Sequence, residues 1–156
     1  MTDHVVRRAV VGDIEEILRL RGVMFDAIGI RDEKDEWIHA SRAILESGLA
    51  EGSILGAVVE RGREAGLCAG GLLHVHAMLG SPRFPRGAFG YIGSIAVDPP
   101  WRRQGLGEAI VTFLVSEARE LGLERVELHA TPDGERIYRR LGFGERDGGT
   151  ELRLVI

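Results

Sequence analysis

The sequence predicts an α/β fold, in which a single domain spanning residues 1–156 has a mixed, mostly antiparallel central sheet with helices on both faces. Strand-like and helix-like segments follow one another in the order β-α-α-β-β-β-α-β-α-β. Strands joined directly are expected to pair antiparallel, whereas strands separated by a helix can pair in parallel. At 156 residues and 44% hydrophobic composition, the chain has the size of one domain with a substantial core.

The chain is predicted to open with a strand followed by a helix. Residues 5–10 are rich in valine and are typical of a strand. Asp13 can cap the helix that follows, and Glu16 lies three residues further on, as in a capping box. One face of this helix collects Ile14, Ile17, Leu18 and Arg21. The apolar segment 24–29 either lines a pocket or continues this helix.

The next elements are a second helix and a pair of strands. Helical spacing of apolar residues covers residues 32–47, and Gly48 is placed to end this helix. Residues 53–60 and 67–75 are strand-like and are separated by a polar, glycine-bearing connection, so they are expected to pair antiparallel. Residues 80–87 contain both proline and glycine, which indicates an irregular loop.

The second half of the chain alternates strands with helices. A strand over residues 89–97 is followed by a helix over residues 106–121, whose apolar residues recur at helical spacing. Residues 125–130 form the next predicted strand, and a turn then starts a short helix that carries Tyr138. The alternating residues 150–156 are predicted to close the chain as a final strand.

Composition excludes several classes of protein. The net charge of −4 and the pI near 5.8 argue against a surface adapted as a whole to nucleic acid or to anionic membranes. A single cysteine, Cys68, cannot form an internal disulfide, and the first residues lack the pattern of a secretory leader. No apolar stretch reaches the roughly 18 to 20 residues that span a bilayer. We therefore expect a cytoplasmic protein with neither nucleic-acid nor membrane partners.

The segment between the strand 89–97 and the next helix has the features of a phosphate-binding loop. The first amides of a helix have no intrahelical partner, and the helix dipole places partial positive charge beside them. Gly105 and Gly107 allow a ligand to approach the backbone closely, and Arg102 and Arg103 add positive charge. A cofactor that carries a diphosphate is therefore expected at this helix start.

The spacing of the glycines narrows the choice of cofactor. The third glycine of a dinucleotide fingerprint is missing, and no Gly-Lys-Ser/Thr follows, which excludes a P-loop. What remains is Arg-x-x-Gly-x-Gly after a strand, which resembles the acetyl-CoA motif of the GNAT superfamily of N-acetyltransferases. Further blocks at residues 97–99, 127–130 and 138–143 match the same pattern in order. This resemblance implies the GNAT fold, with a sheet splayed near its middle.

The resemblance also implies how acetyl-CoA would be held as the acyl donor. The backbone of Ile95, Ala96 and Val97 would pair with the pantetheine arm and hold the thioester carbonyl, while their side chains belong to the core. The diphosphate would be held by Arg102, Arg103, Gln104, Gly105, Leu106 and Gly107. Many family members have glycine where this chain has Arg103, so a positive φ at this position would strain the arginine. No metal is expected.

Tyr138 is the predicted catalytic acid, because it aligns with the tyrosine that donates a hydrogen bond or proton to the departing sulfur in many relatives. The general base is less defined, since residues 91–94 lack the strand glutamate that some members use. His129 is the first candidate for this base. Alternatives are His74, His76 and Glu36, or deprotonation through water.

These residues together predict an acetyl-CoA-dependent N-acetyltransferase that acts on a primary amine of a small molecule or peptide. Two alternatives remain open: transfer of another acyl group from CoA, and a non-catalytic acyl-CoA sensor. A metal site of Cys68 with His74 and His76 is not expected, because a strand spacing of ~3.3 Å per residue holds the cysteine away from the histidines. The sequence identifies neither the acceptor nor the oligomeric state, and the resemblance allows a homodimer.

Overall fold

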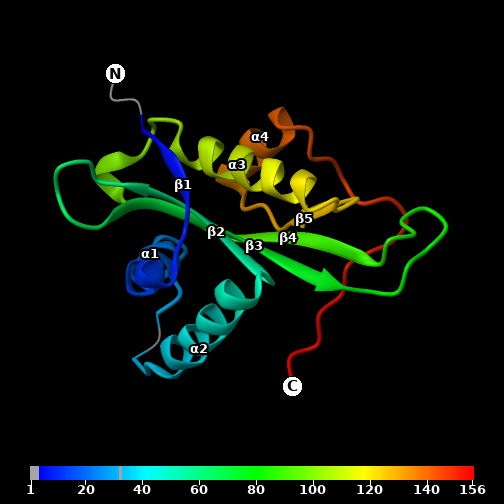
Figure 1. The fold of residues 1–156 in the computed structure, drawn as a ribbon, viewed down its shortest axis with the longest axis horizontal. Coiled ribbons are helices and arrows are strands. Elements are labelled where there is room, and N and C mark those ends of the chain that lie inside the picture. Colours follow the sequence, from blue (N-terminus) through cyan, green and yellow to red (C-terminus); the bar gives the residue numbers. More distant parts are fainter. Residues whose placement is uncertain (1–3, 32) are drawn as a thin grey trace.

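The computed structural model describes residues 4–31 and 33–156, and within them the predicted α/β fold is confirmed (Figure 1). Five strands form one open sheet in the order β1-β2-β3-β4-β5. The strands are β1 (Val6–Arg8), β2 (Ile54–Glu60), β3 (Leu67–Ala77), β4 (Ala88–Val97) and β5 (Val126–Leu128). The helices are α1 (Ile14–Ala27), α2 (Glu36–Glu51), α3 (Leu106–Glu120) and α4 (Pro132–Arg140), with short 3-10 turns η1 (Val11–Asp13) and η2 (Pro99–Trp101).

The sheet is mixed and mostly antiparallel, as predicted. Strands β1 to β4 pair antiparallel with their neighbours, and β5, which follows α3, pairs in parallel with β4. Helices α1 and α2 lie on one face of the sheet, and α3 and α4 on the other (Figure 1). In the described residues, no helix combines the length and the apolar character that crossing a membrane requires.

Each face of the sheet has its own core. On the α1 and α2 side, Leu18 and Leu45 pack with the strand residues Ile54 and Val58. On the α3 side, Ile110, Val111 and Leu114 are fully buried against the sheet residues Leu73 and Ile92. The helical spacing of these apolar residues is therefore what positions α3, and with it the predicted phosphate-binding loop, on the sheet.

A β-bulge interrupts the middle of β4. Leu72 pairs with Gly93 and Gly70 pairs with Ala96, so two β4 residues, Ser94 and Ile95, stand opposite Gly71 alone. Ser94 has a φ of +56°, which is uncommon for a residue other than glycine. The extra residue reverses the side-chain alternation, so Ile92 is buried on the α3 side and Ala96 on the α1 side.

Gly71 makes room for the bulge. A Cβ atom at this position would lie 2.4 Å from Cδ1 of Ile95 and 2.7 Å from Cγ2 of Ile110. The missing side chain therefore lets Ile95, within the bulge, pack against α3.

The sheet opens between β4 and β5, which confirms the predicted splay. Their parallel pairing covers only Gly90 to Ile92 on β4 and Val126 to Leu128 on β5. From Gly93 onward, β3 is the only strand partner of β4 among the described residues. One backbone edge of β4 is therefore free of strand partners in the half that leads to the loop.

The second helix ends later than its glycine predicted. Gly48 lies inside α2 and is buried against β2, where a Cβ atom would come within 2.5 Å of Cδ1 of Ile54. Gly52, with a φ of +79°, caps the helix instead. Gly48 therefore allows close packing of α2 on β2 and does not end the helix. Asp32, the first residue of the predicted helix, lies outside the described residues.

The predicted capping box at Asp13 and Glu16 is wrong. Asp13 makes no side-chain hydrogen bond to the start of α1, because its carboxylate accepts from Arg7 at 2.8 and 3.0 Å and from the Val10 amide at 2.8 Å. Glu16 accepts from the Leu67 amide at 2.9 Å, which ties α1 to β3. Local contacts with Val10 and Arg7 therefore occupy the Asp13 carboxylate, and a contact between α1 and β3 occupies that of Glu16.

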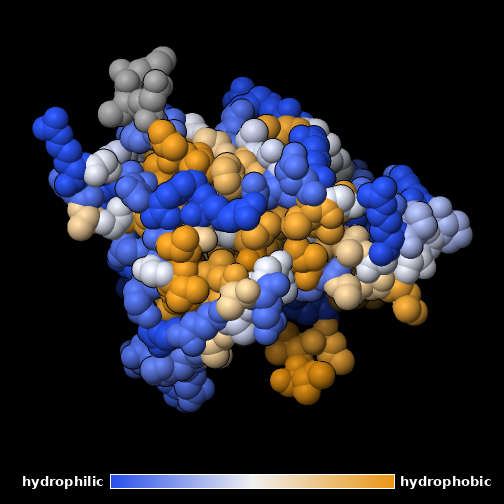
Figure 2. Space-filling view, viewed as in Figure 1, coloured by the Kyte–Doolittle hydropathy of each residue, from blue (hydrophilic) through white to orange (hydrophobic). Residues whose placement is uncertain are grey.

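The predicted final strand over residues 150–156 is also wrong. This tail forms no strand and is exposed, and its apolar end is seen as a protruding orange group in Figure 2. A strand needs a neighbour for its backbone hydrogen bonds, and the tail has none among the described residues. Alternation of apolar residues was therefore not sufficient. The first and fifth strands are also shorter than the predicted 5–10 and 125–130.

Candidate functional site

The loop between β4 and α3 has the backbone shape of an anion-binding turn. Strand β4 ends at Val97, and the 3-10 turn η2 follows. Arg103 and Gly105 then adopt positive φ values of +62° and +78° before α3 begins at Leu106. Glycine adopts this conformation without cost, whereas Arg103 is strained in it. The departure from glycine that the sequence showed at Arg103 thus has a structural consequence.

The first turn of α3 presents free amides to an open surface. Ala109 donates to the Gly105 carbonyl at 3.0 Å, and the amides before it in the first turn lack such a helical acceptor. Cβ atoms built at Gly105 and Gly107 would meet nothing within 4 Å, so this surface is open to a ligand. The amides, the helix dipole and the exposed Arg102 and Arg103 fit the diphosphate of a CoA ester.

Two side chains of the loop are held by local contacts. Arg102 donates from Nε to the Val97 carbonyl at 3.1 Å, which leaves its terminal guanidinium nitrogens without a hydrogen bond among the described residues. Gln104 accepts a hydrogen bond from Nε2 of His4 at 3.2 Å. Arg102 is therefore anchored beside the loop with its fork available to an anion.

A buried carboxylate that the sequence analysis missed fixes the start of this loop. Asp98 is buried and accepts from Arg19 at 2.8 and 3.0 Å and from Arg61 at 2.7 Å. Both arginines also donate to the Leu67 carbonyl. Burial alone would raise the pKa of Asp98, but the two guanidinium groups outweigh it and hold the pKa below its usual value. The network joins α1 and β3 to the end of β4.

The free edge of β4 offers backbone groups but not side chains. Ile95 and Val97 are half-buried and pack in the α3-side core, and Ala96 is buried on the other face. Their side chains are core residues, as predicted. The binding role of their backbone stays a prediction, and it agrees with the missing strand partner, because buried backbone groups need a hydrogen-bond partner.

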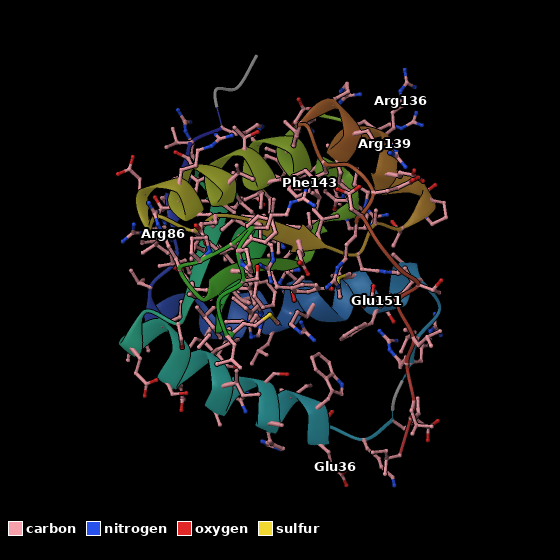
Figure 3. All side chains as sticks on the ribbon, turned by 90° about the vertical axis from the view of Figure 1, so that its right-hand side faces the viewer. Glu36, Arg86, Arg136, Arg139, Phe143 and Glu151 are labelled. Carbon is pink, nitrogen blue, oxygen red and sulfur yellow. The ribbon has the colours of Figure 1, made fainter. Side chains whose placement is uncertain are left out.

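Tyr138 lies in the same α3-side core as Ile95 and Val97. Its half-buried ring packs edge-on against Phe143, with ring centroids 6.1 Å apart. Its hydroxyl has no hydrogen bond among the described residues, and burial raises the pKa of the phenol above its usual value. In Figure 3, Phe143 lies beneath α4, whereas Arg136 and Arg139 extend outward from that helix.

The candidate bases occupy different places. His129 is exposed, directly after β5. His74 and His76 stack with ring centroids 6.1 Å apart, as their spacing predicted, and burial, with smaller contributions from His76 and Arg21, lowers the pKa of His74. Glu36 is exposed at the start of α2, at the opposite end of the molecule from α4 (Figure 3). The structure thus brings neither Glu36 nor the histidine pair onto the α4 side.

A second residue that the sequence analysis did not assign to the site is Arg21. The sequence signal was an arginine on the apolar face of the first helix. In the structure its guanidinium donates to the hydroxyl of Ser94, the bulge residue of β4. The side chain therefore reaches the place where the edge of β4 becomes free.

Comparison with known proteins agrees with this geometry. The family model described as Acetyltransferase (GNAT) family matches residues 14–143. A GCN5-related N-acetyltransferase from Ralstonia eutropha JMP134 is 31% identical, with a TM-score of 0.79 over 96% of this chain and 98% of that chain. A predicted acetyltransferase from Clostridium acetobutylicum, solved with acetyl-CoA, is 21% identical and has a TM-score of 0.85 over 96% of both chains, which shows a shared fold.

Curated relatives match over shorter segments. A glucosamine 6-phosphate N-acetyltransferase from Trypanosoma brucei brucei is 35% identical over 75 residues, which cover 47% of this chain and 51% of the relative. A protein of the same description from Oryza sativa subsp. japonica is 35% identical over 80 residues, or 50% of this chain and 48% of the relative. The chain thus spans about half the length of these relatives. On the family match and the shared fold, the chain belongs to the GNAT family of acetyltransferases.

Proposed function

We propose that this chain is an acetyl-CoA-dependent N-acetyltransferase that acts on a primary amine of a small molecule or peptide. The observation that carries the proposal is the free backbone edge of β4, which leads directly into the open first turn of α3. Acetyl-CoA needs a strand-like partner for the amides of its pantetheine arm and an anion site for its diphosphate. The two features supply both, in one continuous segment of a GNAT-family chain.

The proposed binding roles follow from these features. Residues 102–107 hold the diphosphate through the free amides of the loop and the arginine side chains. The backbone of residues 95–97 orients the pantetheine arm, and an amide of this edge donates to the thioester carbonyl, where negative charge develops during attack. Acetyl-CoA supplies the acetyl group as a thioester, and the amine attacks it directly.

Tyr138 is proposed to donate a proton or hydrogen bond to the sulfur as it leaves. Because burial raises its pKa, the phenol keeps its proton throughout the neutral range and is available as an acid. Its hydroxyl is also free to take this role, since no described residue occupies it.

Removal of a proton from the amine is proposed to involve His129 or water. A lysine-like amine with a pKa of ~10.4 is neutral in only about one molecule per few thousand at pH 7, whereas an α-amino group near ~7.8 is neutral in roughly one in seven. A base therefore matters most for strongly basic acceptors. His74 is the second candidate, because its lowered pKa keeps the imidazole neutral and able to accept a proton.

For the acceptor, the names of the relatives suggest a starting point. The curated proteins from Trypanosoma and Oryza are glucosamine 6-phosphate N-acetyltransferases, so this phosphorylated amino sugar is the first amine to test. Peptide N-termini, amino acids, polyamines and aminoglycosides complete the panel. A cytoplasmic location and a single domain over residues 1–156 are part of the same proposal.

A homodimer is proposed through the tail at residues 150–156. This exposed tail has a strand-like alternation, and β5 has β4 as its only strand partner among the described residues. A hollow beside β5 is lined by Val115, Leu123, Val126 and Phe143, among others. Addition of the tail of a second copy to the edge of β5 would give both the tail and this edge a strand partner. Light scattering should then give a dimer for the full chain and a monomer after removal of the tail.

A thiol-release assay with acetyl-CoA and the amine panel tests the proposed function. We expect CoA release that requires both acetyl-CoA and an amine, and saturable binding of acetyl-CoA in a calorimetric titration. No binding of acetyl-CoA would refute the proposal. Binding without CoA release for any amine would favour the acyl-CoA sensor, which the missing glutamate at residues 91–94 also supports. Faster release from longer acyl-CoA esters would identify another acyl group as the natural one.

A further inference from the structure

Arg21 is an exception among the half-buried arginines of the chain. Six arginines in the described residues are half-buried, and five of them form an ion pair with a carboxylate. These five are Arg7, Arg19, Arg42, Arg61 and Arg125. Arg21 has no carboxylate partner among the described residues. Its charge is therefore uncompensated within this part of the chain.

The guanidinium of Arg21 is held in a defined position. One terminal nitrogen donates to the Ser94 hydroxyl, and the group lies 5.1 Å from the ring centroid of Phe25 and 5.9 Å from that of Trp37. These two rings pack edge-on with centroids 5.2 Å apart. The Nε atom is buried without a hydrogen-bond partner. Aromatic stacking and a single neutral hydrogen bond thus fix a cation that lacks an anion.

The energetic cost of this arrangement points to a ligand. Removal of a charge from water is costly unless the charge is paired, and burial lowers the pKa of Arg21 accordingly. The neighbouring His74 adds no negative charge, and the described side chains that contact the guanidinium, Phe25, Trp37 and Ser94, are aromatic or neutral. An oxyanion would supply both the missing charge and acceptors for the unused N–H groups.

The position of Arg21 relates it to the acceptor. Ser94 is a bulge residue on the free edge of β4, one residue before the segment assigned to the thioester. Arg21 reaches it from α1, on the face of the sheet opposite to α3 and the diphosphate loop (Figure 1). A group bound there would lie next to the thioester without competing with the CoA diphosphate. This is where an amine acceptor has to approach.

We propose that Arg21 binds an oxyanion group of the amine acceptor, so that the preferred substrates are amines that also carry a carboxylate or a phosphate. This inference rests on the proposed acetyltransferase function and specifies its substrate class. The planar guanidinium binds either oxyanion through two parallel hydrogen bonds, which a lysine cannot reproduce.

The first test compares matched amines with and without the anionic group. The pairs are amino acids against their amides, and phosphorylated amino sugars or amino alcohols against the unphosphorylated amines. The Arg21→Ala variant is expected to raise KM for the anionic amines by about tenfold or more, since a hydrogen bond to a charged group is lost, with little change for the neutral ones. Arg21→Lys should recover only part of this difference. Arg63→Ala, at an exposed position in the connection between β2 and β3, is the matched control.

The second test does not depend on turnover. With CoA present at saturation, inorganic phosphate and acetate are titrated against thermal unfolding of the wild type, Arg21→Ala and Arg63→Ala. We expect stabilisation by at least one of the two anions in the wild type and in Arg63→Ala, and its loss in Arg21→Ala. The pair of anions distinguishes a phosphate from a carboxylate ligand.

The outcomes separate this proposal from the proposed function. If Arg21→Ala raised KM equally for anionic and neutral amines, the role of Arg21 would be overturned. The same holds if phosphate and acetate stabilised all three proteins equally against thermal unfolding. Absence of turnover with every amine would count against the transferase function, while the anion titration would still decide whether Arg21 forms an anion site.

Discussion

The Tyr138→Phe substitution isolates the one hydroxyl group that the proposed mechanism uses as an acid. The phenol makes no hydrogen bond within the described residues, and its ring packs edge-on against Phe143 at 6.1 Å. A phenylalanine ring preserves this packing. The substitution should therefore change the free energy of unfolding by less than about 0.5 kcal/mol, which urea denaturation can measure.

The expected effect on turnover is much larger. General acid catalysis by a positioned side chain contributes about 10²- to 10⁴-fold, so kcat of Tyr138→Phe should fall by at least about 100-fold. The apparent affinity for acetyl-CoA should stay within about twofold, because the hydroxyl acts on the departing sulfur and not on the bound diphosphate. A thiol-release assay with saturating amine gives kcat, and calorimetry gives the affinity.

The pH dependence provides a second readout of the same group. Burial raises the pKa of Tyr138 above the usual value of about 10, so the acid form persists through the neutral and mildly alkaline range. Activity should accordingly not fall between about pH 7 and pH 9.5 through loss of this proton. A Tyr138→Phe enzyme that retains more than about a third of the wild-type kcat would refute the assignment of the acid.

Three further substitutions test how the fold positions the site. Asp98→Asn should destabilise the fold by about 3 kcal/mol, because two guanidinium groups lose their buried partner. The folded-state pKa of Asp98 is lowered, so the wild type keeps its extra stability over Asp98→Asn above the unfolded pKa of about 3.9. It loses this extra stability as the pH falls through the lower folded value. Urea denaturation at pH 7 and pH 3 measures the difference. Arg103→Gly relieves a positive φ, so thermal unfolding should show equal or higher stability. Calorimetry should show up to about fivefold weaker binding of acetyl-CoA, because an exposed charge is lost. Arg63→Gly, which has no positive φ to relieve, is the control, and equal destabilisation of both variants would contradict the strain at Arg103. Gly71→Ala places a methyl group 2.4 Å from Ile95, so denaturation should show a loss of about 2 kcal/mol together with weaker acetyl-CoA binding, and unchanged binding would separate the bulge from the site.

Local patterns predicted the parts of the fold that depend on local interactions. The strand before the loop and the helix from Leu106 follow from sequence periodicity, because neighbouring residues determine them. The same reasoning failed for residues 150–156, since an alternating pattern does not supply a partner strand. Gly48 was assigned to a helix end because the sequence does not reveal that Ile54 packs against it.

The parts of the candidate site that escaped prediction depend on contacts between distant segments. Asp98 binds Arg19 and Arg61, which lie 79 and 37 residues away in the chain. Arg21 meets Ser94 across 73 residues, and its only trace in the sequence was a charge on an otherwise apolar helix face. Such pairings are set by the sheet register and by the bulge, which a single sequence does not specify.

Amide hydrogen exchange in the presence and absence of acetyl-CoA tests the central claim most directly, because it observes the backbone groups to which binding is assigned. We predict that acetyl-CoA slows exchange in two segments, residues 95–97 on the free edge of β4 and residues 103–108 in the loop and first turn of α3. The connection between β2 and β3 should be unaffected. Binding of acetyl-CoA without protection of either segment would contradict the proposed site.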